Sequence, residues 1–383
     1  MLGALLLVRF VDELIAFLPA GTLAAVTGEF HLTYAQAGLL LSIFAAGGLA
    51  GSALTVAADH VSRRALAAGG AVAVGLSLLA FGLSPWFAGL LVASVTWGIA
   101  SDALTGGAET ALVDVSGPHL TAALGRQNLL AAAGDLLSPL LLVLAGLARV
   151  GWRALFVGAS FLLFGYGTWL GLSPLPPPTL DDETSVVGGV MQVLRDPRAW
   201  LLALAEAVIS IVDEPYLAFM IIFLERSRGV PVALATLVAT ADLAGSAVGS
   251  YFAPRILGGR GSRGLAVCVV GLPLAIIVLI TAPSTALQFA AAGAGGLCGA
   301  VVWVAVQSAT LGLRPGLAGT TSAVVSSIAL PAYAFPVLVG AVADGAGLTS
   351  AMSLYVGVTL VLVVLLVPLS RLRAGGASRG SGV

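Results

Sequence analysis

Apolar runs long enough to cross a lipid bilayer fill almost the whole sequence. About 20 apolar residues suffice for a helical span, and twelve such runs are separated by short turn-rich segments. Charged residues make up only 9% of the chain, against roughly 25% in a soluble globular protein. The sequence therefore predicts an all-α polytopic membrane protein with twelve transmembrane helices. The predicted spans are residues 2–26, 34–58, 65–84, 86–113, 123–148, 151–173, 199–224, 231–256, 263–282, 285–312, 317–343 and 348–370.

The spans fall into two sets of six, separated by the one long polar stretch of the chain. We expect an N-terminal six-helix bundle over residues 1–173, a cytoplasmic linker over 174–198 and a C-terminal six-helix bundle over 199–373. The apolar run 186–194 inside the linker is typical of a short helix on the membrane surface. The Gly- and Ser-rich residues 374–383 are expected to be a disordered tail.

Short matches between the two sets suggest a duplicated six-span unit. Residues 49–53 read Leu-Ala-Gly-Ser-Ala and recur as residues 243–247, an offset of 194. The triplet Val-Asp-Glu at 11–13 recurs at 212–214, an offset of 201. Such a parallel repeat predicts two pseudo-symmetric bundles of the kind found in one transporter architecture.

The distribution of arginine predicts the orientation in the membrane. With a cytoplasmic N-terminus, twelve arginines fall on the inner side, four on the outer side and Arg9 inside a span. The positive-inside rule therefore favours cytoplasmic termini at both ends. No basic leader precedes the first run, so no cleavable signal peptide is expected. We expect an integral protein of a bacterial cytoplasmic (inner) membrane, acting as a monomer.

Several functional classes are disfavoured by what the sequence contains. The net charge of −1 and the absence of lysine argue against nucleic-acid binding and against an ATP-binding loop, which needs a lysine. The three histidines lie in loops, and the two cysteines have no spacing typical of a metal knuckle or disulfide framework. No cofactor, no metal site and no enzymatic activity are therefore expected.

Ionisable residues inside the predicted spans are the main functional signal. A charge at mid-depth of a bilayer is costly, so such residues usually face a bundle interior or a water-filled path. Carboxyl groups there can carry protons, and a surplus of acids attracts cations. We expect them to line a wet path between the two halves. Well inside the spans the only base is Arg9, and the acids there are Asp12, Glu13, Asp102, Glu109, Asp135, Glu206, Asp213, Glu214 and Asp242.

Helical spacing predicts which of these residues meet. Arg9 precedes Asp12 by three residues and Glu13 by four, so the three share one helical face. Asp102, Thr105 and Glu109 form a second polar stripe. Because the first and fourth spans run in opposite directions, Arg9 and Glu109 fall at similar depth. The sequence therefore predicts an ion pair of Arg9 with either Glu109 or Glu13.

In the seventh predicted span, Glu206, Ser210 and Asp213 share a face if the helix is continuous, while Glu214 points about 100° away from Asp213. Pro215 is expected to kink that helix. For Asp135 and Asp242 a structural role is at least as plausible as a functional one. The candidates for proton coupling or for the substrate cavity are Arg9, Asp12, Glu13, Asp102, Glu109, Glu206, Asp213 and Glu214.

The loop at residues 55–64 reads Thr-Val-Ala-Ala-Asp-His-Val-Ser-Arg-Arg. It resembles the signature loop of the major facilitator superfamily in Asp59, Arg63 and Arg64, although the usual glycines and one arginine are replaced. The resemblance implies two six-helix bundles and secondary transport by alternating access, with these three residues as a gating loop. The positive-inside rule alone also explains the two arginines.

Gly134, Ser138 and Pro139 in the fifth span are similar to the antiporter motif of drug–proton exchangers in that superfamily, but the tandem glycines after the proline are missing. Packing of small residues explains them equally well. The resemblance implies a proton-coupled exporter of small lipophilic or cationic compounds. The alternatives are proton-coupled uptake or exchange of a nutrient or anionic metabolite, a metal-ion exporter, and a receptor or assembly factor that transports nothing.

Overall fold

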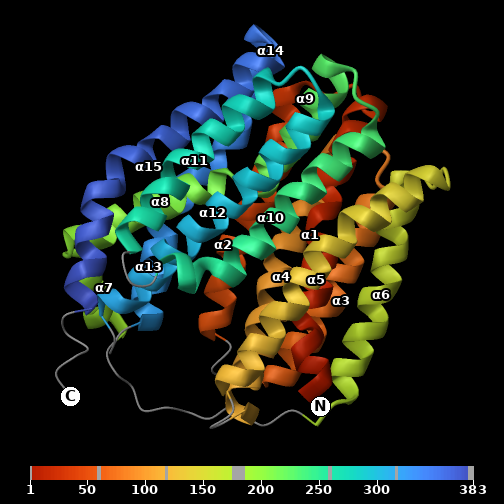
Figure 1. The fold of residues 1–383 in the computed structure, drawn as a ribbon. Helices are drawn as coiled ribbons and strands as arrows, with labels where there is room; N and C mark the ends of the chain where they lie inside the picture. The colour runs from red at the N-terminus through yellow and green to blue at the C-terminus, as the bar shows by residue number, and fades with distance from the viewer. Residues whose placement is uncertain are drawn as a thin grey trace. The chain divides into compact units, whose positions relative to one another are not determined.

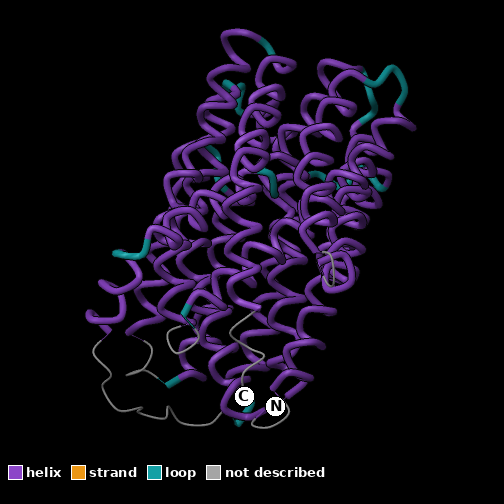
Figure 2. Tube along the Cα trace, turned by 60° about the vertical axis from the view of Figure 1, so that its left-hand side comes forward, coloured by secondary structure: helices purple, strands orange, loops and turns teal. Residues whose placement is uncertain are grey.

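The computed structural model describes residues 2–57, 62–116, 120–174, 186–257, 261–314 and 318–377. Within these residues every regular element is a helix, and short loops connect successive helices (Figure 2). The chain divides into two compact units, Met1–Asp181 and Asp182–Val383, which we call unit 1 and unit 2.

Unit 1 contains one helix for each of the first six predicted spans (Figure 1). α1 packs most closely against α5, α2 against α4, and α3 against both α4 and α6. The helices are α1 (Leu2–Glu29), α2 (Tyr34–Ala57), α3 (Arg63–Leu83), α4 (Phe87–Ser116), α5 (Leu120–Leu147) and α6 (Trp152–Leu172).

Unit 2 begins with the short helix α7, at the position that the apolar run 186–194 predicted. Its closest helix pair is α10 with α12, followed by α11 with α12. The helices are α7 (Val186–Leu194), α8 (Pro197–Ile211), α9 (Glu214–Arg228), α10 (Val232–Leu257), α11 (Gly261–Thr281), α12 (Thr285–Leu313), α13 (Ala318–Ala329), the 3₁₀ segment η4 (Leu330–Ala334), α14 (Phe335–Ala346) and α15 (Leu348–Ala377).

Each of the twelve predicted spans is helical over most of its described part. By length and composition, ten helical segments of the described chain could cross a membrane. α1 and α2 are not among the ten: α1 has 28 residues but carries three charged side chains in its first half, and the apolar described part of α2 is Tyr34–Gly48. The all-helical membrane fold is as predicted.

The seventh span is broken, which corrects the prediction of one kinked helix. α8 ends at Ile211, and Val212 and Asp213 have non-helical backbone angles before α9 begins at Glu214. Pro215 has no N–H to bond to the Ile211 carbonyl, so the helical ladder stops one turn before the proline. Asp213 therefore does not continue the helical face of Glu206 and Ser210.

A second break, which the sequence did not predict, interrupts the eleventh span. α13 ends at Ala329, the 3₁₀ segment η4 follows, and α14 begins at Phe335. Pro331 lies within this segment and Pro336 is the second residue of α14, and each proline removes a backbone donor from the helical ladder.

Glycines let the main helix pairs of each unit approach closely. A Cβ on Gly70 of α3 would lie 2.5 Å from the backbone nitrogen of Leu104 in α4, and one on Gly134 of α5 would lie 2.6 Å from the Phe10 carbonyl of α1. Gly134 thus has a packing role, which is the simpler of the two interpretations of the Gly134–Pro139 motif.

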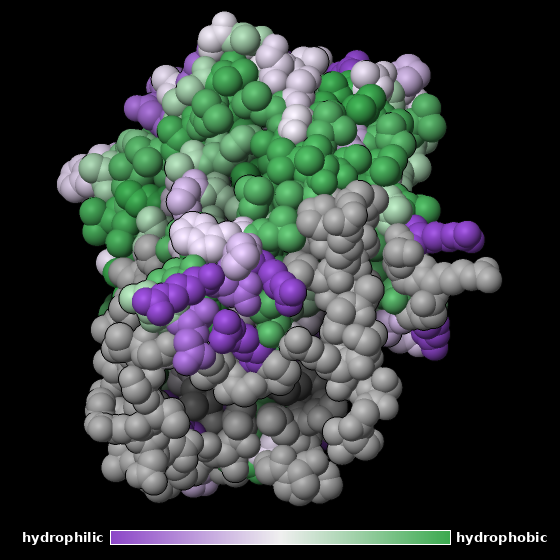
Figure 3. Space-filling model, turned by 90° about the vertical axis from the view of Figure 1, so that its left-hand side faces the viewer, coloured by the Kyte–Doolittle hydropathy of each residue, from purple (hydrophilic) through white to green (hydrophobic). Residues whose placement is uncertain are grey.

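The surface of the described chain suits contact with lipid. From one side, hydrophobic residues cover most of the upper part of the described surface, and hydrophilic residues gather in a smaller area below (Figure 3). Large apolar side chains are widely exposed, with Leu172, Val364 and Leu129 each more than 70% exposed. An apolar surface of this extent is typical of contact with lipid rather than with water.

Candidate functional site

Arg9 is the centre of a charged cluster between α1 and α4 in unit 1. Its Nε lies 2.5 Å from Glu109 Oε1, and its Nη1 lies 3.7 Å from Asp12 Oδ2. The side chains of Arg9 and Glu109 are both 36% exposed, and that of Asp12 is 16% exposed. The structure therefore contains the first of the two predicted ion pairs. Glu13 also acts electrostatically on Arg9.

Asp12 has a second partner on α4. Ser101 Oγ donates a hydrogen bond of 2.6 Å to Asp12 Oδ1. The guanidinium of Arg9 and the hydroxyl of Ser101 thus hold this carboxylate from two helices. The sequence did not identify Ser101, because a serine in an apolar helix usually bonds to its own backbone.

Asp102 lies beside this cluster, at the crossing of α4 with α2. A Cβ on Gly48 of α2 would lie 3.7 Å from Asp102 Oδ1, so the carboxyl group lies against a helix backbone that has no side chain there. Asp12 and Arg9 both act electrostatically on Asp102. Five predicted residues of unit 1, Arg9, Asp12, Glu13, Asp102 and Glu109, therefore belong to one connected set.

In unit 2 the predicted acids are divided between two places. Glu206 of α8 is buried and accepts a hydrogen bond of 2.5 Å from Ser326 Oγ of α13. Asp213 precedes α9, is exposed, and its carboxyl accepts a bond from the Glu214 backbone N–H. Glu214 is the first residue of α9.

Asp242 of α10, for which a structural role was as plausible as a functional one, is close enough to Asp213 for the two charges to interact. It also acts electrostatically on Tyr216, a buried residue of α9. The two aspartates are 29 residues apart and lie on different elements, so helical spacing could not reveal their proximity.

The predicted gating loop is only partly described. Asp59 lies outside the described residues. Ser62 caps α3, since its side chain accepts a bond of 3.1 Å from the Ala65 backbone N–H. Arg63 is buried and Arg64 is exposed at the first turn of that helix.

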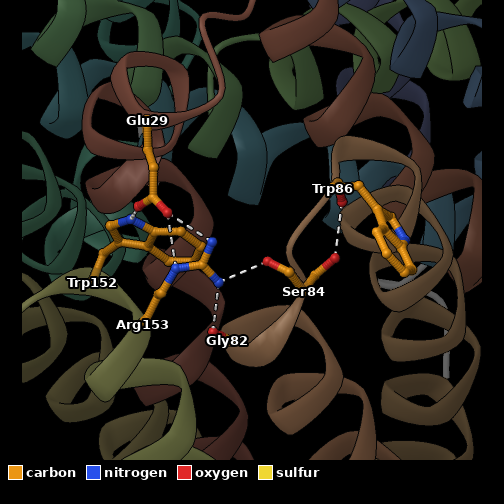
Figure 4. A network of polar contacts seen from close by, with 6 residues as sticks. All are labelled: Glu29, Gly82, Ser84, Trp86, Trp152 and Arg153. Atoms are coloured by element: carbon orange, nitrogen blue, oxygen red, sulfur yellow. Dashed lines mark hydrogen bonds and ion pairs between the residues drawn. The ribbon is translucent and has the colours of Figure 1, made fainter.

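A network that the sequence did not predict joins the ends of α1, α3 and α6 (Figure 4). Arg153 Nε and Nη2 donate to Glu29 Oε1 at 3.0 and 2.7 Å, and Arg153 Nη1 donates to the carbonyls of Gly82 and Ser84. Trp152 Nε1 donates to the other oxygen of Glu29 at 2.7 Å. These bonds, those from Arg153 foremost, hold the pKa of Glu29 below its ordinary value.

Unit 2 has a related contact near the end of α11. Arg228, at the end of α9, donates to the carbonyl of Ile280 near the end of α11, and its guanidinium lies 5.5 Å from the ring centroid of Phe223. In both units, therefore, an arginine satisfies a carbonyl at a helix end that would otherwise lack a partner.

Two cysteine side chains are also in contact in unit 2, although their spacing in the sequence did not suggest a contact. Cys268 of α11 and Cys298 of α12 are free cysteines whose side chains are hydrogen-bonded to each other. We assign them no part in the candidate site.

Comparisons with known proteins identify the family. The family model described as Major Facilitator Superfamily matches residues 5–280. No curated protein matches the chain. Among solved structures, a bacterial homolog of the human lysosomal transporter Spinster has a TM-score of 0.81 at 18% identity, covering 98% of this chain and 97% of its own.

Two further structures have the same fold at lower identity. The nucleoside transporter NupG has a TM-score of 0.79 at 13% identity, covering 96% of this chain and 98% of its own. A peptide transporter, POT, has a TM-score of 0.73 at 14% identity, covering 97% and 95%. The family consists of secondary transporters of small molecules rather than enzymes. With a family match over most of its length and an all-helical fold shared with these proteins, the chain belongs to the major facilitator superfamily.

Proposed function

We propose that this transporter couples the movement of protons to the export of small lipophilic or cationic compounds by alternating access. The residues proposed for coupling or for the substrate cavity are Arg9, Asp12, Glu13, Asp102, Glu109, Glu206, Asp213 and Glu214. We further propose that both termini are cytoplasmic, as the arginine distribution favours, and that Asp59, Arg63 and Arg64 form a gating contact.

The observation that carries this proposal is the charge balance around Arg9. The guanidinium group contacts Glu109 at 2.5 Å and Asp12 at 3.7 Å, so the one base well inside the predicted spans is already paired with acids. Glu13 and Asp102 add further negative charge to the same set. A surplus of carboxylates over bases favours protons and cationic solutes.

A second candidate function is proton-coupled uptake or exchange of a nutrient or anionic metabolite. It is favoured by the 36% exposure of the Arg9 side chain, which leaves part of the guanidinium accessible to an anionic group. In that case the acids would carry protons only. Replacing Glu109 would then strengthen binding of the anion, because Arg9 would lose its competing partner.

Reconstituted vesicles with an imposed pH gradient test the proposal. Ethidium serves as the lipophilic cation, and a pH-sensitive dye inside the vesicles reports proton movement. We expect the pH gradient to drive ethidium movement together with counterflow of protons, and Asp12→Asn to reduce both. Glu29→Gln is the matched control, since Glu29 lies at a helix end outside the predicted span.

The two candidate functions give opposite outcomes in these vesicles. Proton movement that depends on an anionic solute and not on ethidium would favour the second function. Ethidium movement that ignores the pH gradient would contradict proton coupling altogether.

A further inference from the structure

The last turns of α10 carry an exposed stripe that begins at an arginine. Its members are all exposed and follow the spacing i, i+3, i+4 and i+7: Val248, Tyr251, Phe252 and Arg255. Residues with this spacing share one face of a helix. The candidate membrane span in α10 ends at Leu257, so the arginine lies at the end of the span and the apolar side chains extend from it toward the middle.

α11 carries a second stripe of the same kind. Arg263 is exposed in the first turn of the helix, and the candidate membrane span in α11 begins there. Val267, Val270 and Leu274 follow at spacings of four, seven and eleven residues and are 69%, 42% and 54% exposed. Each helix therefore presents an arginine at the end of a span and apolar side chains over the next two or three turns.

The two stripes begin beside a direct contact between the helices. A Cβ on Gly264 of α11 would collide with the backbone carbonyl of Ile256 at the end of α10. Gly264 directly follows Arg263, and Ile256 directly follows Arg255. The end of α10 and the start of α11 are thus packed backbone to backbone, with one arginine next to each side of the contact.

Two exposed aromatic rings hold the guanidinium of Arg255. Its Cζ lies 5.5 Å from the ring centroid of Tyr251 and 5.7 Å from that of Phe252. The two rings are 68% and 42% exposed by residue and meet edge to face, with centroids 5.0 Å apart. A guanidinium over an aromatic ring is attracted by the ring face and keeps its in-plane N–H donors for another partner.

This end of unit 2 has no acid to neutralise its arginines. In the sequence, no aspartate or glutamate occurs over residues 243–343. Arg314, at the end of α12, pairs with Asp196. The side chains of Arg255 and Arg263 form no ion pair and no hydrogen bond with any described residue. Positive groups that are exposed without a compensating acid favour an anionic partner.

The sequence repeat shows that this arrangement is specific to unit 2. At the offset of 194, Tyr251 and Phe252 correspond to the two alanines at 57–58, and Ala253 corresponds to Asp59. Unit 2 therefore lacks the acid of the proposed gating loop and has two aromatic side chains that unit 1 lacks. An internal ion pair like that proposed for Asp59 is not available here, whereas contact with an external anion is.

The order of groups along the stripes matches the order of groups in a phospholipid. Aromatic side chains concentrate at the headgroup level of a bilayer, and arginines at helix ends reach the headgroups. Below them the exposed apolar side chains of both stripes lie where acyl chains would run. A free phosphate ion would use the arginines alone. A zwitterionic headgroup would also bring a positive amine toward them, so the charge favours an anionic lipid.

We propose that the adjoining ends of α10 and α11 bind an anionic phospholipid. Its phosphate contacts Arg255 and Arg263, its glycerol ester region lies against Tyr251 and Phe252, and an acyl chain follows the exposed stripe of α11. The inference depends neither on the transported substrate nor on proton coupling, so it can fail or hold independently of the proposed function.

Native mass spectrometry of the full chain in detergent tests the proposal. Phosphatidylglycerol is the probe, and phosphatidylcholine with the same acyl chains is the zwitterionic comparison. We expect the wild type to bind the first phosphatidylglycerol molecule more tightly. Arg255→Gln and Arg263→Gln should each weaken that binding roughly fivefold, the effect of one arginine at an anionic membrane surface, and should leave phosphatidylcholine binding unchanged.

Two further variants separate the geometry of the site from its charge. Arg255→Lys should bind with intermediate affinity, because an ammonium group keeps the charge but not the planar donors that stack on the rings. Tyr251→Ala should weaken phosphatidylglycerol binding without any change of charge. If a glutamine variant does not fold, as judged by thermal unfolding without lipid, these two variants test the same site.

The matched control is Arg149→Gln, which removes the same charge from an exposed position in the turn after α5 of unit 1. It should leave the preference for phosphatidylglycerol unchanged. An equal loss in this control would show that net charge alone sets the preference and would overturn the site. Retention of the full preference in the double variant Arg255→Gln/Arg263→Gln would overturn it as well.

Competition with inorganic phosphate distinguishes a lipid from a free anion. We expect phosphatidylglycerol to stay bound to the wild type in an excess of phosphate, because the acyl chain and the ester region contribute to binding. Displacement of the lipid by phosphate would show that the two arginines recognise a phosphate group alone, and the proposal of a lipid site would then be wrong.

Discussion

Arg9 and Glu109 join the first and fourth helices of unit 1 through a contact of 2.5 Å between Nε and Oε1. They are separated by 100 residues in the sequence. Since Arg9 is the one base well inside the predicted spans, its removal changes the charge of the whole cluster rather than one bond. The effect of losing the Arg9–Glu109 pair can be separated from the effect of the changed charge, because Glu109 can be neutralised in the same protein.

Arg9→Ala should reduce proton-linked transport by about tenfold or more, since leaving a partly buried carboxylate unpaired costs roughly 1–3 kcal/mol. The double variant Arg9→Ala/Glu109→Gln removes the unpaired charge and should recover part of the activity. Initial rates in vesicles, normalised to the amount of reconstituted protein, check this. Failure of the double variant to exceed Arg9→Ala would argue against a pairing role.

Two adjacent glycines of α3 offer a matched test of helix packing. Gly70→Ala should lower stability by about 1–3 kcal/mol, because the added methyl group would meet backbone atoms of Leu104 and Ala100 at 2.5 to 3.0 Å. Gly69→Ala has open space around its Cβ and should be neutral or slightly stabilising. Thermal unfolding followed by fluorescence-detected size exclusion measures both. Equal midpoints for the two variants would contradict the close approach of α3 and α4.

The Glu29–Arg153 network should make stability depend on pH. Hydrogen bonds from Arg153 lower the pKa of Glu29 below its ordinary value of 4.5. The ionised carboxylate therefore stabilises the fold fully at pH values above 4.5, and this stabilisation is lost as the pH falls through the lowered pKa. Since Glu29 is 45% exposed, the effect should be about 1 kcal/mol or less.

Glu29→Gln should accordingly lower the unfolding midpoint at neutral pH, and the difference from the wild type should shrink in acid. Arg153→Gln should cost more at neutral pH, because it also removes the bonds to the Gly82 and Ser84 carbonyls. A Glu29→Gln difference that is independent of pH would show that the carboxylate charge is not what matters.

Asp59→Asn should slow transport severalfold without changing protein abundance, if Asp59 forms a gating contact with Arg63 or Arg64. The neutral side chain keeps the size of the group but loses the attraction to a guanidinium. Transport rates and quantitative immunoblots from the same membranes check this. An unchanged rate would leave the two arginines explained by membrane orientation alone.

The fold could be predicted from the sequence because the thickness of the lipid bilayer sets a minimum length for every span. The Arg9–Glu109 pair could be predicted for a similar reason, because antiparallel spans of known length place these two charged residues at comparable depth. Both inferences use one-dimensional information, namely position along a helix that crosses a fixed thickness.

Contacts made by uncharged side chains, and breaks in helices, could not be predicted in this way. The hydroxyls of Ser101 and Ser326 bond to Asp12 and Glu206 across helices, whereas most serines and threonines of such helices bond within their own turn. Pro215 indicated a disturbance of the seventh span, but a proline sequence pattern alone does not distinguish a bend from a complete interruption.

The glycine-lined crossing of α10 and α12 has a mechanical consequence. At Gly245, Gly249 and Gly296 a methyl group would collide with the backbone of the opposite helix, so the two helix backbones pack directly against each other there with no flexible side chain between them. We expect α10 and α12 to move together as one rigid body during transport. Bending within unit 2 is then expected to concentrate at its two helix interruptions, after Ile211 and at Leu330–Ala334.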